Sequence, residues 1–341
     1  MKYRRVVVHH TGGPEVMRIE EAELPVPGPG QARVKILAAD VSFSDVNLRR
    51  GRYPGAPQPP FTPGYAMVGV VDQLGPAAGA GQLAIGQPVA ALTFYGSYSQ
   101  YLCLPMQDLI PMPTGLDPAE AACLPLNYVA THQMLHRIAH VAQGQRILAH
   151  GAAGGVGVAF LELGSLAGLE MYGTASRSKH DLVARLGATP IDYRAEDFVA
   201  RIATATGGQG VDAAFDPIGA AHLRQSARAV RPGGTVVGYG FYTSANRGGA
   251  VLLDVLSQYL QVALSALSPS RKRVVFYDIR TQAKKRPDWY REDLTALFDL
   301  LAAGKLHPVI AARLPLEEAV HAHQLIERAE VEGKLVLIPN P

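Results

Sequence analysis

Apolar residues change their spacing along the chain near residue 146, and this change divides the sequence into two kinds of structure. Before it, short apolar runs are separated by proline and glycine turns such as Pro25–Gly30 and Pro59–Gly64, and helix signals are few. Short runs between turn residues are typical of an antiparallel, barrel-like domain. The strands expected there are 6–9, 31–39, 66–74, 88–92 and 99–105, with one short helix over 44–50.

From Arg146 onward, short apolar strands alternate with segments of helical periodicity, as a doubly wound parallel sheet requires. The expected strands are 146–150, 169–174, 189–192, 211–216, 234–239 and 274–278, and the expected helices are 155–168, 178–187, 195–205 and 219–229. Before this region we expect a helix with Asp117 as N-cap and Pro118 at its first position, and another over 128–141. A helix over 252–267 is also expected.

The C-terminal segment has its own pattern: an amphipathic helix over 290–303 closed by Gly304, a strand over 310–314, a helix over 316–329 and a strand over 334–338. Since the second sheet is already complete, these elements are expected to return to the first domain. The sequence therefore predicts an α/β protein with one domain built from residues 1–122 and 281–341 and a parallel-sheet domain over 123–280.

Length and charge narrow the class of protein. A chain of 341 residues suggests two domains at about 150 residues each. The formal net charge of +3 is too small to argue for a nucleic-acid partner. No apolar stretch approaches the ~20 residues of a membrane span, and the N-terminus lacks a signal-peptide pattern, so we expect a cytoplasmic protein. The two cysteines form no CxxC pair, which excludes a four-cysteine zinc lobe.

The segment RILAHGAAGGVG (146–157) contains the first motif that indicates a ligand. A buried strand, a glycine turn and an apolar helix in this order form the first half of a dinucleotide-binding βαβ unit. At Gly154, Gly155 and Val156 the backbone can approach a pyrophosphate, and Gly157 permits close packing of helix on strand. Ala152 stands where the first glycine of GxGxxG belongs, so the motif here is AxGGxG.

The loop after the second strand of this unit favours NADPH as the cofactor. An NAD site places an acid there to hold the ribose hydroxyls. This chain offers Ser176, Arg177, Ser178 and Lys179 instead. Two cations and two hydroxyls suit the 2′-phosphate of NADPH, which an acid would repel; the alternative is a basic loop that is merely solvated.

Five segments together resemble a known family: AADVSFSDVNLRRGRYP (38–54), PFTPGYAMVGVV (60–71), HGAAGGVG (150–157), LGATPIDYRAEDF (186–198) and GKLVLIP (333–339). In this order they resemble the zinc-free quinone oxidoreductase branch of the medium-chain dehydrogenase/reductase superfamily. The resemblance covers essentially the whole chain. It implies a GroES-like barrel completed by the C-terminal segment, a Rossmann domain, an active site in the cleft, NADPH and commonly a homodimer.

The resemblance also implies further cofactor-binding residues. Tyr193 matches a tyrosine that contacts the 2′-phosphate in the family. Asn127 and Thr131 match residues near the nicotinamide ribose and the phosphates. Gly238, Gly240 and Phe241 match the segment whose backbone holds the nicotinamide amide.

Zinc-dependent members of the superfamily supply a cysteine, a histidine–glutamate pair, and a cysteine or aspartate. The matching positions here are Ser42, Tyr65 with Ala66, and Asn127, and none offers a thiolate, imidazole or carboxylate. Without a metal to polarise a hydroxyl group, reduction of a conjugated acceptor is favoured over alcohol oxidation. Ala66 also departs from the zinc-free branch, in which an acid commonly follows this pattern.

Tyr53 is the residue that we expect in the substrate pocket. Its segment is similar to the GLYP of quinone reductases and to the SDIN…GNYG pattern of mitochondrial-type enoyl-thioester reductases, in which the tyrosine is a proposed proton donor. A phenol of pKa about 10 can donate a hydrogen bond or a proton to a developing enolate. Ser42 and Asn47, from the same region, complete the candidate catalytic set. The alternative is that Tyr53 only packs in a loop, since solvent can protonate a quinol.

His132, His136 and His140 recur at intervals of four residues, but no acid-bearing HExxH pattern accompanies them, so no functional metal is expected. The sequence thus predicts a zinc-independent, NADPH-dependent reductase of quinones or α,β-unsaturated carbonyl compounds, acting as a homodimer on a small molecule. Two alternatives stay open: an enoyl-thioester reductase, and a protein that binds NADPH without turnover, as crystallin-like and vesicle-associated relatives suggest.

Overall fold

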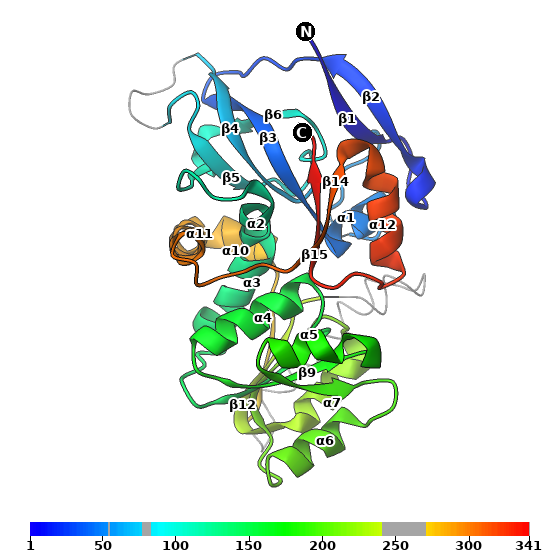
Figure 1. The fold of residues 1–341 in the computed structure, drawn as a ribbon, viewed down its shortest axis with the longest axis vertical. Helices are drawn as coiled ribbons and strands as arrows, with labels where there is room; N and C mark the ends of the chain where they lie inside the picture. The colour runs from blue at the N-terminus through cyan, green and yellow to red at the C-terminus, as the bar shows by residue number, and fades with distance from the viewer. Residues whose placement is uncertain (54, 77–82, 241–270, 341) are drawn as a thin grey trace. The chain divides into compact units, whose positions relative to one another are not determined.

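The computed structural model describes residues 1–53, 55–76, 83–240 and 271–340 and has a mixed α/β fold (Figure 1). The chain divides into two compact units. Unit 1 contains Met1–Val129 together with Asp288–Pro341, and unit 2 contains Ala130–Pro287. The boundaries expected from the sequence, 122/123 and 280/281, lie slightly earlier in the chain at both junctions.

Unit 1 is built mainly of antiparallel strands. Its strands are β1 (Lys2–Val8), β2 (Met17–Glu23), β3 (Gln31–Val41), β4 (Ala66–Leu74), β5 (Pro88–Leu92), β6 (Tyr101–Pro105), β7 (Ile110–Pro111), β14 (Ile310–Pro315) and β15 (Lys334–Ile338). The main sheet has the order β14-β15-β3-β4-β5-β7, β6 also pairs with β3, and β1 and β2 form a separate antiparallel pair. The sequence did not predict β2, because MRIEEAE is rich in glutamate and mostly solvent-facing.

The last strand ties the C-terminus into unit 1. β15 runs antiparallel to β3, with Val336 opposite Asp40. The neighbouring Lys334 forms an ion pair with Asp40, both residues being buried, and its Nζ donates to the carbonyl oxygen of Val41 at 2.9 Å. Removing either partner would leave the other as an uncompensated buried charge.

Unit 1 also carries the helices α1 (Phe43–Arg49), α2 (Pro118–Ala122), α11 (Pro287–Ala302, whose first residue belongs to unit 2) and α12 (Ala319–Glu327), the short 3₁₀ turns Pro14–Val16, Met106–Asp108 and Leu316–Glu318, and a π-helical segment, Leu124–Tyr128. The carboxylate of Asp117 accepts from the backbone N–H groups of Ala119 and Glu120 at 2.9 and 3.0 Å, so the predicted N-cap of α2 is confirmed. The glycine expected to close α11, Gly304, has the left-handed φ of +64°.

Unit 2 contains one parallel sheet of six strands: β8 (Arg146–His150), β9 (Glu170–Ala175), β10 (Ala188–Asp192), β11 (Val211–Asp216), β12 (Val230–Gly238) and β13 (Arg273–Phe276). Their order across the sheet is β10-β9-β8-β11-β12-β13. Numbered along the unit this is 3-2-1-4-5-6, the doubly wound order of dinucleotide-binding folds. The predicted fold class is confirmed, and the strand order reverses between β8 and β11.

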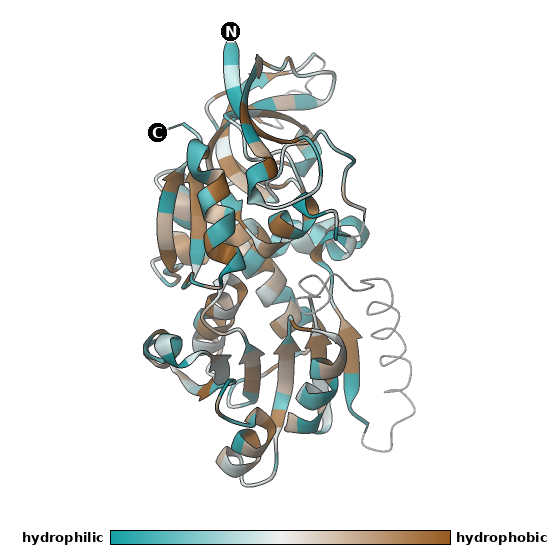
Figure 2. Ribbon diagram, turned by 90° about the vertical axis from the view of Figure 1, so that its right-hand side faces the viewer, coloured by the Kyte–Doolittle hydropathy of each residue, from teal (hydrophilic) through white to brown (hydrophobic). Residues whose placement is uncertain are grey.

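Helices cover both faces of this sheet: α4 (Gly155–Leu166), α5 (His180–Arg185), α6 (Phe198–Ala205) and α7 (Ala220–Ala229), with a 3₁₀ turn at Arg177–Lys179. On one face, Leu148 and Ala214 join a core that includes Phe198 of α6 and Leu223 of α7. On the other face, Phe160 of α4 lies 4.3 Å from the ring of Phe215. Because neighbouring strand residues point to opposite buried faces, the middle of these strands is mostly apolar, and Figure 2 colours them mostly brown.

The segment that links the units departs from its expected form. In place of one helix over 128–141 there is the π-helical segment Leu124–Tyr128, α3 (Val129–His132), and a second π-helical segment, Gln133–Ile138. Beyond it, α10 (Ile279–Lys285) completes unit 2. The helix expected over 252–267 lies outside the described residues. Among the described helices, none is both long and apolar enough to cross a membrane.

Candidate active site

The glycine loop of unit 2 has the geometry that its sequence predicts. β8 ends at His150, Gly151 has a left-handed φ of +67°, and α4 begins at Gly155. A Cβ at Gly157 would lie 2.3 Å from the carbonyl oxygen of Gly151 and 2.5 Å from the carbonyl carbon of Ala152. The helix therefore packs against the loop backbone at a distance that only glycine allows.

Ala152, the departure from GxGxxG, is accommodated by a second glycine that sequence reasoning missed. The backbone N–H of Ala152 donates to the carbonyl oxygen of Thr174 on β9 at 3.0 Å, and its side chain is fully buried. A Cβ at Gly173 would lie 2.6 Å from the Cβ of Ala152. Because Gly173 has no side chain, the methyl group of Ala152 has room against β9. A glycine at position 152 would not need this space.

No side chain caps the N-terminus of α4, whose N-cap is Gly154. The N–H groups of Gly155, Val156 and Gly157 lie in the first turn, which has no intrahelical acceptors and carries the positive end of the helix dipole. This N-terminus follows β8 at the point where the strand order reverses. Doubly wound proteins bind the phosphates of their ligands at this place.

The basic loop follows β9 directly. Ser176 and Lys179 are half-buried and Arg177 is exposed, and the hydroxyl oxygens of Ser176 and Ser178 are 3.4 Å apart. Tyr193 follows β10, whose last residue, Asp192, is in register with Ala175 at the end of β9. Tyr193 is 51 % exposed, and its ring lies under the guanidinium of Arg194 at 5.6 Å. The sheet therefore brings the basic loop and Tyr193 to neighbouring strand ends.

Two predicted glycines lie at the end of β12. Gly238 is the last residue of the strand, and its carbonyl oxygen accepts from the N–H of Tyr277 at 2.8 Å. A Cβ at Gly240 would lie 2.4 Å from the carbonyl oxygen of Pro217, so the chain passes close to the end of β11. The third predicted residue of this segment, Phe241, lies outside the described residues.

Asn127 and Thr131 lie in the π-helical and α-helical parts of the linking segment and are buried. The hydroxyl of Thr131 is buried without a hydrogen-bond partner among the described residues. A π-helical turn shifts side chains relative to an α-helix and is frequent at functional sites. The helix ends at Ile138, so His140, at φ +53°, does not continue the face of His132 and His136.

A buried polar cluster at the carboxyl ends of β8 and β11 was not predicted. The Nδ1 of His150 lies 3.0 Å from the hydroxyl of Thr174, and its Nε2 lies 3.1 Å from the hydroxyl of Ser226. That hydroxyl donates to Oδ2 of Asp216 at 2.6 Å, and Nδ1 of His222 lies 2.7 Å from the same oxygen. The only sequence signal was that His150 and Asp216 each end an apolar strand.

Burial lowers the pKa of His150 to about 3, so this imidazole is neutral. Burial acts to raise the pKa of Asp216, but hydrogen bonds from His222 and Ser226, together with the nearby imidazoles, lower it to about 2. Ligand atoms of His150, Asp216 and His222 lie within 4.8 Å of one another, the one group of three among the described residues that could hold a metal. Hydrogen bonds satisfy the buried groups of this cluster without an ion.

Tyr53 in unit 1 meets a second tyrosine that the sequence did not connect with it. The hydroxyl oxygens of Tyr53 and Tyr65 are 2.7 Å apart, and their rings pack edge to face at 5.8 Å. Tyr65 is buried and packs on Phe94 at 5.4 Å, whereas Tyr53 is half-buried. The buried phenol thus fixes the position of the more accessible one.

Ser42 caps α1. Its backbone N–H and its hydroxyl both donate to Oδ2 of Asp45, at 2.9 and 2.7 Å, and Asp45 Oδ1 accepts from the N–H of Gly64 at 3.0 Å. Burial, opposed in part by the Ser42 hydrogen bond, raises the pKa of Asp45 to about 7. Asn47, in the same helix, has its side-chain oxygen buried without a hydrogen-bond partner among the described residues. Catalytic roles for Ser42 and Asn47 stay predictions.

The residues of unit 2 fit a dinucleotide: an uncapped helix N-terminus, a close glycine backbone, and a basic loop lie at adjacent strand ends. In unit 1, the positions that the resemblance matches to zinc ligands are Ser42, whose hydroxyl is engaged in capping, Tyr65, whose phenol is paired, and Asn127, whose amide is buried. This donor set does not fit a zinc ion.

The chain is similar to known oxidoreductases. Residues 28–114 match the family "Alcohol dehydrogenase GroES-like domain", and residues 186–337 match "Zinc-binding dehydrogenase". A 2-haloacrylate reductase of Burkholderia sp. is 32 % identical over 98 % of both chains, and a synaptic vesicle membrane protein VAT-1 homolog of Mus musculus is 30 % identical over 99 % of this chain and 84 % of its own. The structure of Escherichia coli quinone oxidoreductase complexed with NADPH superposes with a TM-score of 0.86 at 26 % identity, covering 98 % of this chain and 100 % of that one.

Proposed function

Because the chain belongs to the quinone oxidoreductase branch of the medium-chain dehydrogenase/reductase superfamily, we propose that it reduces a quinone or an α,β-unsaturated carbonyl compound with NADPH and without zinc. Members of this superfamily are oxidoreductases that use a nicotinamide cofactor. The observation that carries the proposal is the Tyr53–Tyr65 hydroxyl pair, because it offers a proton-donating group in unit 1, and Tyr65 is one of the positions that the family resemblance matches to zinc ligands.

When bound, NADPH supplies a hydride from its nicotinamide ring, and the chain's own residues hold and orient it. The N-terminus of α4 binds the pyrophosphate through backbone N–H groups. Ser176, Arg177 and Lys179 bind the 2′-phosphate, and Tyr193 lies beside them. The buried hydroxyl of Thr131 is a further donor for the cofactor.

On the substrate side, the chemistry of the acceptor explains why no metal is needed. Hydride addition to a conjugated carbonyl compound produces an enolate, whose negative charge is shared with the carbonyl oxygen. In this proposal Tyr65 is the donor in the 2.7 Å contact between the two hydroxyl groups, and Tyr53 donates its own hydrogen to the carbonyl oxygen of the substrate. Hydrogen bonds in a chain strengthen one another, so the buried Tyr65 makes Tyr53 a better donor. The similarity to a 2-haloacrylate reductase supports a conjugated acceptor of this kind.

The test is a steady-state survey of NADPH oxidation with quinones, enones, 2-haloacrylate and enoyl-thioesters, using wild type and Tyr53→Phe. A general acid typically contributes 10²–10⁴ in rate, so we expect about a hundredfold lower kcat/KM with enones. With quinones, whose product anion water can protonate, the loss should stay below about tenfold. A chelator should leave all rates unchanged.

Tyr95→Phe is the matched control, because it removes a phenol from an exposed tyrosine of the same unit. It should behave as wild type. Equal rates for Tyr53→Phe and wild type on every substrate would show that Tyr53 only packs. Tight NADPH binding with no turnover on any acceptor would favour the non-catalytic alternative, and activity confined to enoyl-thioesters would favour the thioester reductase.

A further inference from the structure

The buried polar cluster at the carboxyl end of the sheet in unit 2 forms a continuous chain of hydrogen bonds. It runs from the glycine loop through Thr174, His150, Ser226 and Asp216 to His222. The first four of these side chains belong to β9, β8, α7 and β11 in turn, and all four are buried. The chain therefore joins the two strands on either side of the point where the strand order reverses.

Proton positions along this chain follow from its chemistry. Asp216 is ionised, so only the hydroxyl of Ser226 can supply the proton in their 2.6 Å contact. Ser226 then accepts from His150, which requires the proton of that neutral imidazole to be on Nε2. The Nδ1 of His150 is consequently an acceptor, and the hydroxyl of Thr174 donates to it. Every link thus points from the glycine loop toward Asp216.

At the Asp216 end of the hydrogen-bond chain, the remaining donors also point toward the carboxylate. Nδ1 of His222 donates to the oxygen that Ser226 uses, and the other carboxylate oxygen accepts the backbone N–H groups of Ile218 and Gly219 at 2.7 and 3.2 Å. These bonds hold the turn after β11 to the ionised carboxylate. The carboxylate of Asp216 therefore holds both segments: it accepts hydrogen bonds from the turn after β11, and it ends the hydrogen-bond chain that begins at the loop after β8.

At the loop end, the chain acts on backbone. The N–H of Gly151 donates to the hydroxyl of Thr174 at 3.4 Å, and the N–H of Ala152 donates to the carbonyl oxygen of the same residue at 3.0 Å. With its hydrogen directed to His150, the Thr174 hydroxyl presents a lone pair to Gly151. The chain thus fixes the first turn of the loop whose last residues, Gly154–Gly157, begin α4.

We propose that Thr174, His150, Ser226 and Asp216 are positioning residues for cofactor binding, which hold the glycine loop in the shape that accepts a pyrophosphate. The inference rests on the proposed function in that the ligand is a nicotinamide dinucleotide. It predicts that the affinity for the pyrophosphate, rather than for the adenosine 2′-phosphate, depends on hydroxyl groups that never touch the ligand.

The experiment compares four substitutions in unit 2. Thr174→Val removes the hydroxyl at the loop end of the chain, and Thr174→Ser retains it. Thr206→Val is the matched control: its buried hydroxyl also makes two hydrogen bonds, donating to Ile202 and accepting from Gly210, both at 2.8 Å, but at the opposite edge of the sheet. Ser226→Ala breaks the middle of the chain at a residue that makes no hydrogen bond to the loop itself. Dissociation constants for NADPH and for adenosine 2′-monophosphate are measured by calorimetry, with thermal unfolding in parallel.

For Thr174→Val and Ser226→Ala we expect a dissociation constant for NADPH about tenfold above wild type, which corresponds to about 1.4 kcal/mol. Thr174→Ser and Thr206→Val should stay within about twofold of wild type. Adenosine 2′-monophosphate has no pyrophosphate, so its affinity should be the same in all five proteins. Thr206→Val should be destabilised about as much as Thr174→Val, which separates loop positioning from general stability.

Wild-type NADPH affinity in Thr174→Val and Ser226→Ala would overturn this inference while leaving the proposed function intact. An equal loss in Thr206→Val would overturn it as well. One tightly bound metal per chain that disappears in His222→Ala would assign the cluster to an ion instead. If wild type binds neither NADPH nor NADH, the proposed function fails together with the inference.

Discussion

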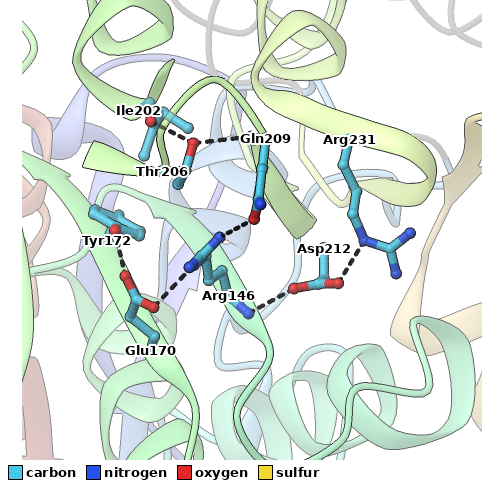
Figure 3. Close-up of polar contacts among 9 residues, drawn as sticks. Arg146, Glu170, Tyr172, Ile202, Thr206, Gln209, Asp212 and Arg231 are labelled. Atoms are coloured by element: carbon cyan, nitrogen blue, oxygen red, sulfur yellow. Dashed lines mark hydrogen bonds and ion pairs between the residues drawn. The ribbon is translucent and has the colours of Figure 1, made fainter. Parts of the chain in front are cut away.

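The two edges of the sheet in unit 2 are made by the same strands but have opposite character. At the amino edge, Arg146 of β8 bonds Glu170 of β9 and Gln209, its backbone N–H donates to Asp212 of β11, and Asp212 pairs with Arg231 (Figure 3). At the carboxyl edge, His150, Thr174 and Asp216, each the last or the last but one residue of its strand, are joined with Ser226 in the buried hydrogen-bond chain. Each of β8, β9 and β11 thus contributes one polar residue to each edge.

Exposure separates the two edges. The side chains of Glu170 and Arg231 are 48 % and 42 % exposed, whereas Asp216 is fully buried. Exposed ion pairs contribute little, about 0–1 kcal/mol each, because water screens them. Buried hydrogen-bonded groups are costly to disrupt, since a partner left alone in the interior loses its solvation. Polar residues are therefore more easily replaced at the amino edge than at the carboxyl edge.

The largest effect should come from Gly157→Ala at the carboxyl edge. The new Cβ would meet the backbone of Gly151 and Ala152, which cannot move aside without opening the loop. We expect NADPH affinity to fall by about a hundredfold or more, that is about 2.7 kcal/mol. Gly207→Ala at the amino edge is the control: its φ of +59° makes alanine strained, but its Cβ meets nothing within 4 Å. It should cost stability and leave the dissociation constant unchanged, and a similar loss in both variants would contradict the comparison.

A smaller effect concerns acid stability. His150 has a pKa of about 3 when folded and about 6.5 when unfolded, so the unfolded chain gains a proton that the folded chain does not as the pH falls from 7 to 5. The stabilisation that is present above pH 6.5 is therefore progressively lost below it, by about 2 kcal/mol at pH 5. When the free energy of unfolding is measured with urea at pH 7 and pH 5, His150→Gln should therefore lose about 2 kcal/mol less than wild type.

Glu170→Gln provides the amino-edge control for that measurement. Hydrogen bonds from Tyr172 and Arg146 lower the pKa of Glu170 below its usual 4.5, so it stays ionised down to pH 5 in both states. Its substitution should leave the difference in stability between pH 7 and pH 5 as in wild type. If His150→Gln has the wild-type difference too, the buried imidazole does not control acid stability.

The smallest effect concerns nucleotide affinity when one cation is removed from either edge of the sheet. Lys179→Ala in the basic loop should weaken NADPH about tenfold, or 1.4 kcal/mol, and leave NADH nearly unchanged, because only NADPH carries the 2′-phosphate. Arg146→Met also removes a cation from unit 2, but at the amino edge, and should change either affinity by no more than about twofold. Calorimetric titration of both nucleotides checks this. Equal wild-type affinities for NADPH and NADH would exclude the assignment of the basic loop.

Local features of the site were predictable because each depends on a few consecutive residues. The loop Gly154–Gly157 and the basic residues 176–179 follow strands with apolar centres, and the Asp117–Pro118 pair marks a helix start. The apolar strands were visible because both faces of this sheet are buried. The opposite case is β2, which is mostly exposed and rich in glutamate, and whose partner β1 alone defines it as a strand.

Contacts between distant residues were decided only by the tertiary structure. Gly173 has no visible role until β9 places it against Ala152, and Tyr65 becomes part of a phenol pair only when β4 begins beside the loop of Tyr53. His150, Thr174, Asp216 and Ser226 are up to 76 residues apart and meet because the strand order is β9-β8-β11. Propensity and turn chemistry act over a few residues, so the sequence determined the elements and the loop between them. The order in which the strands pair, which no local pattern encodes, determined which polar groups share one buried chain.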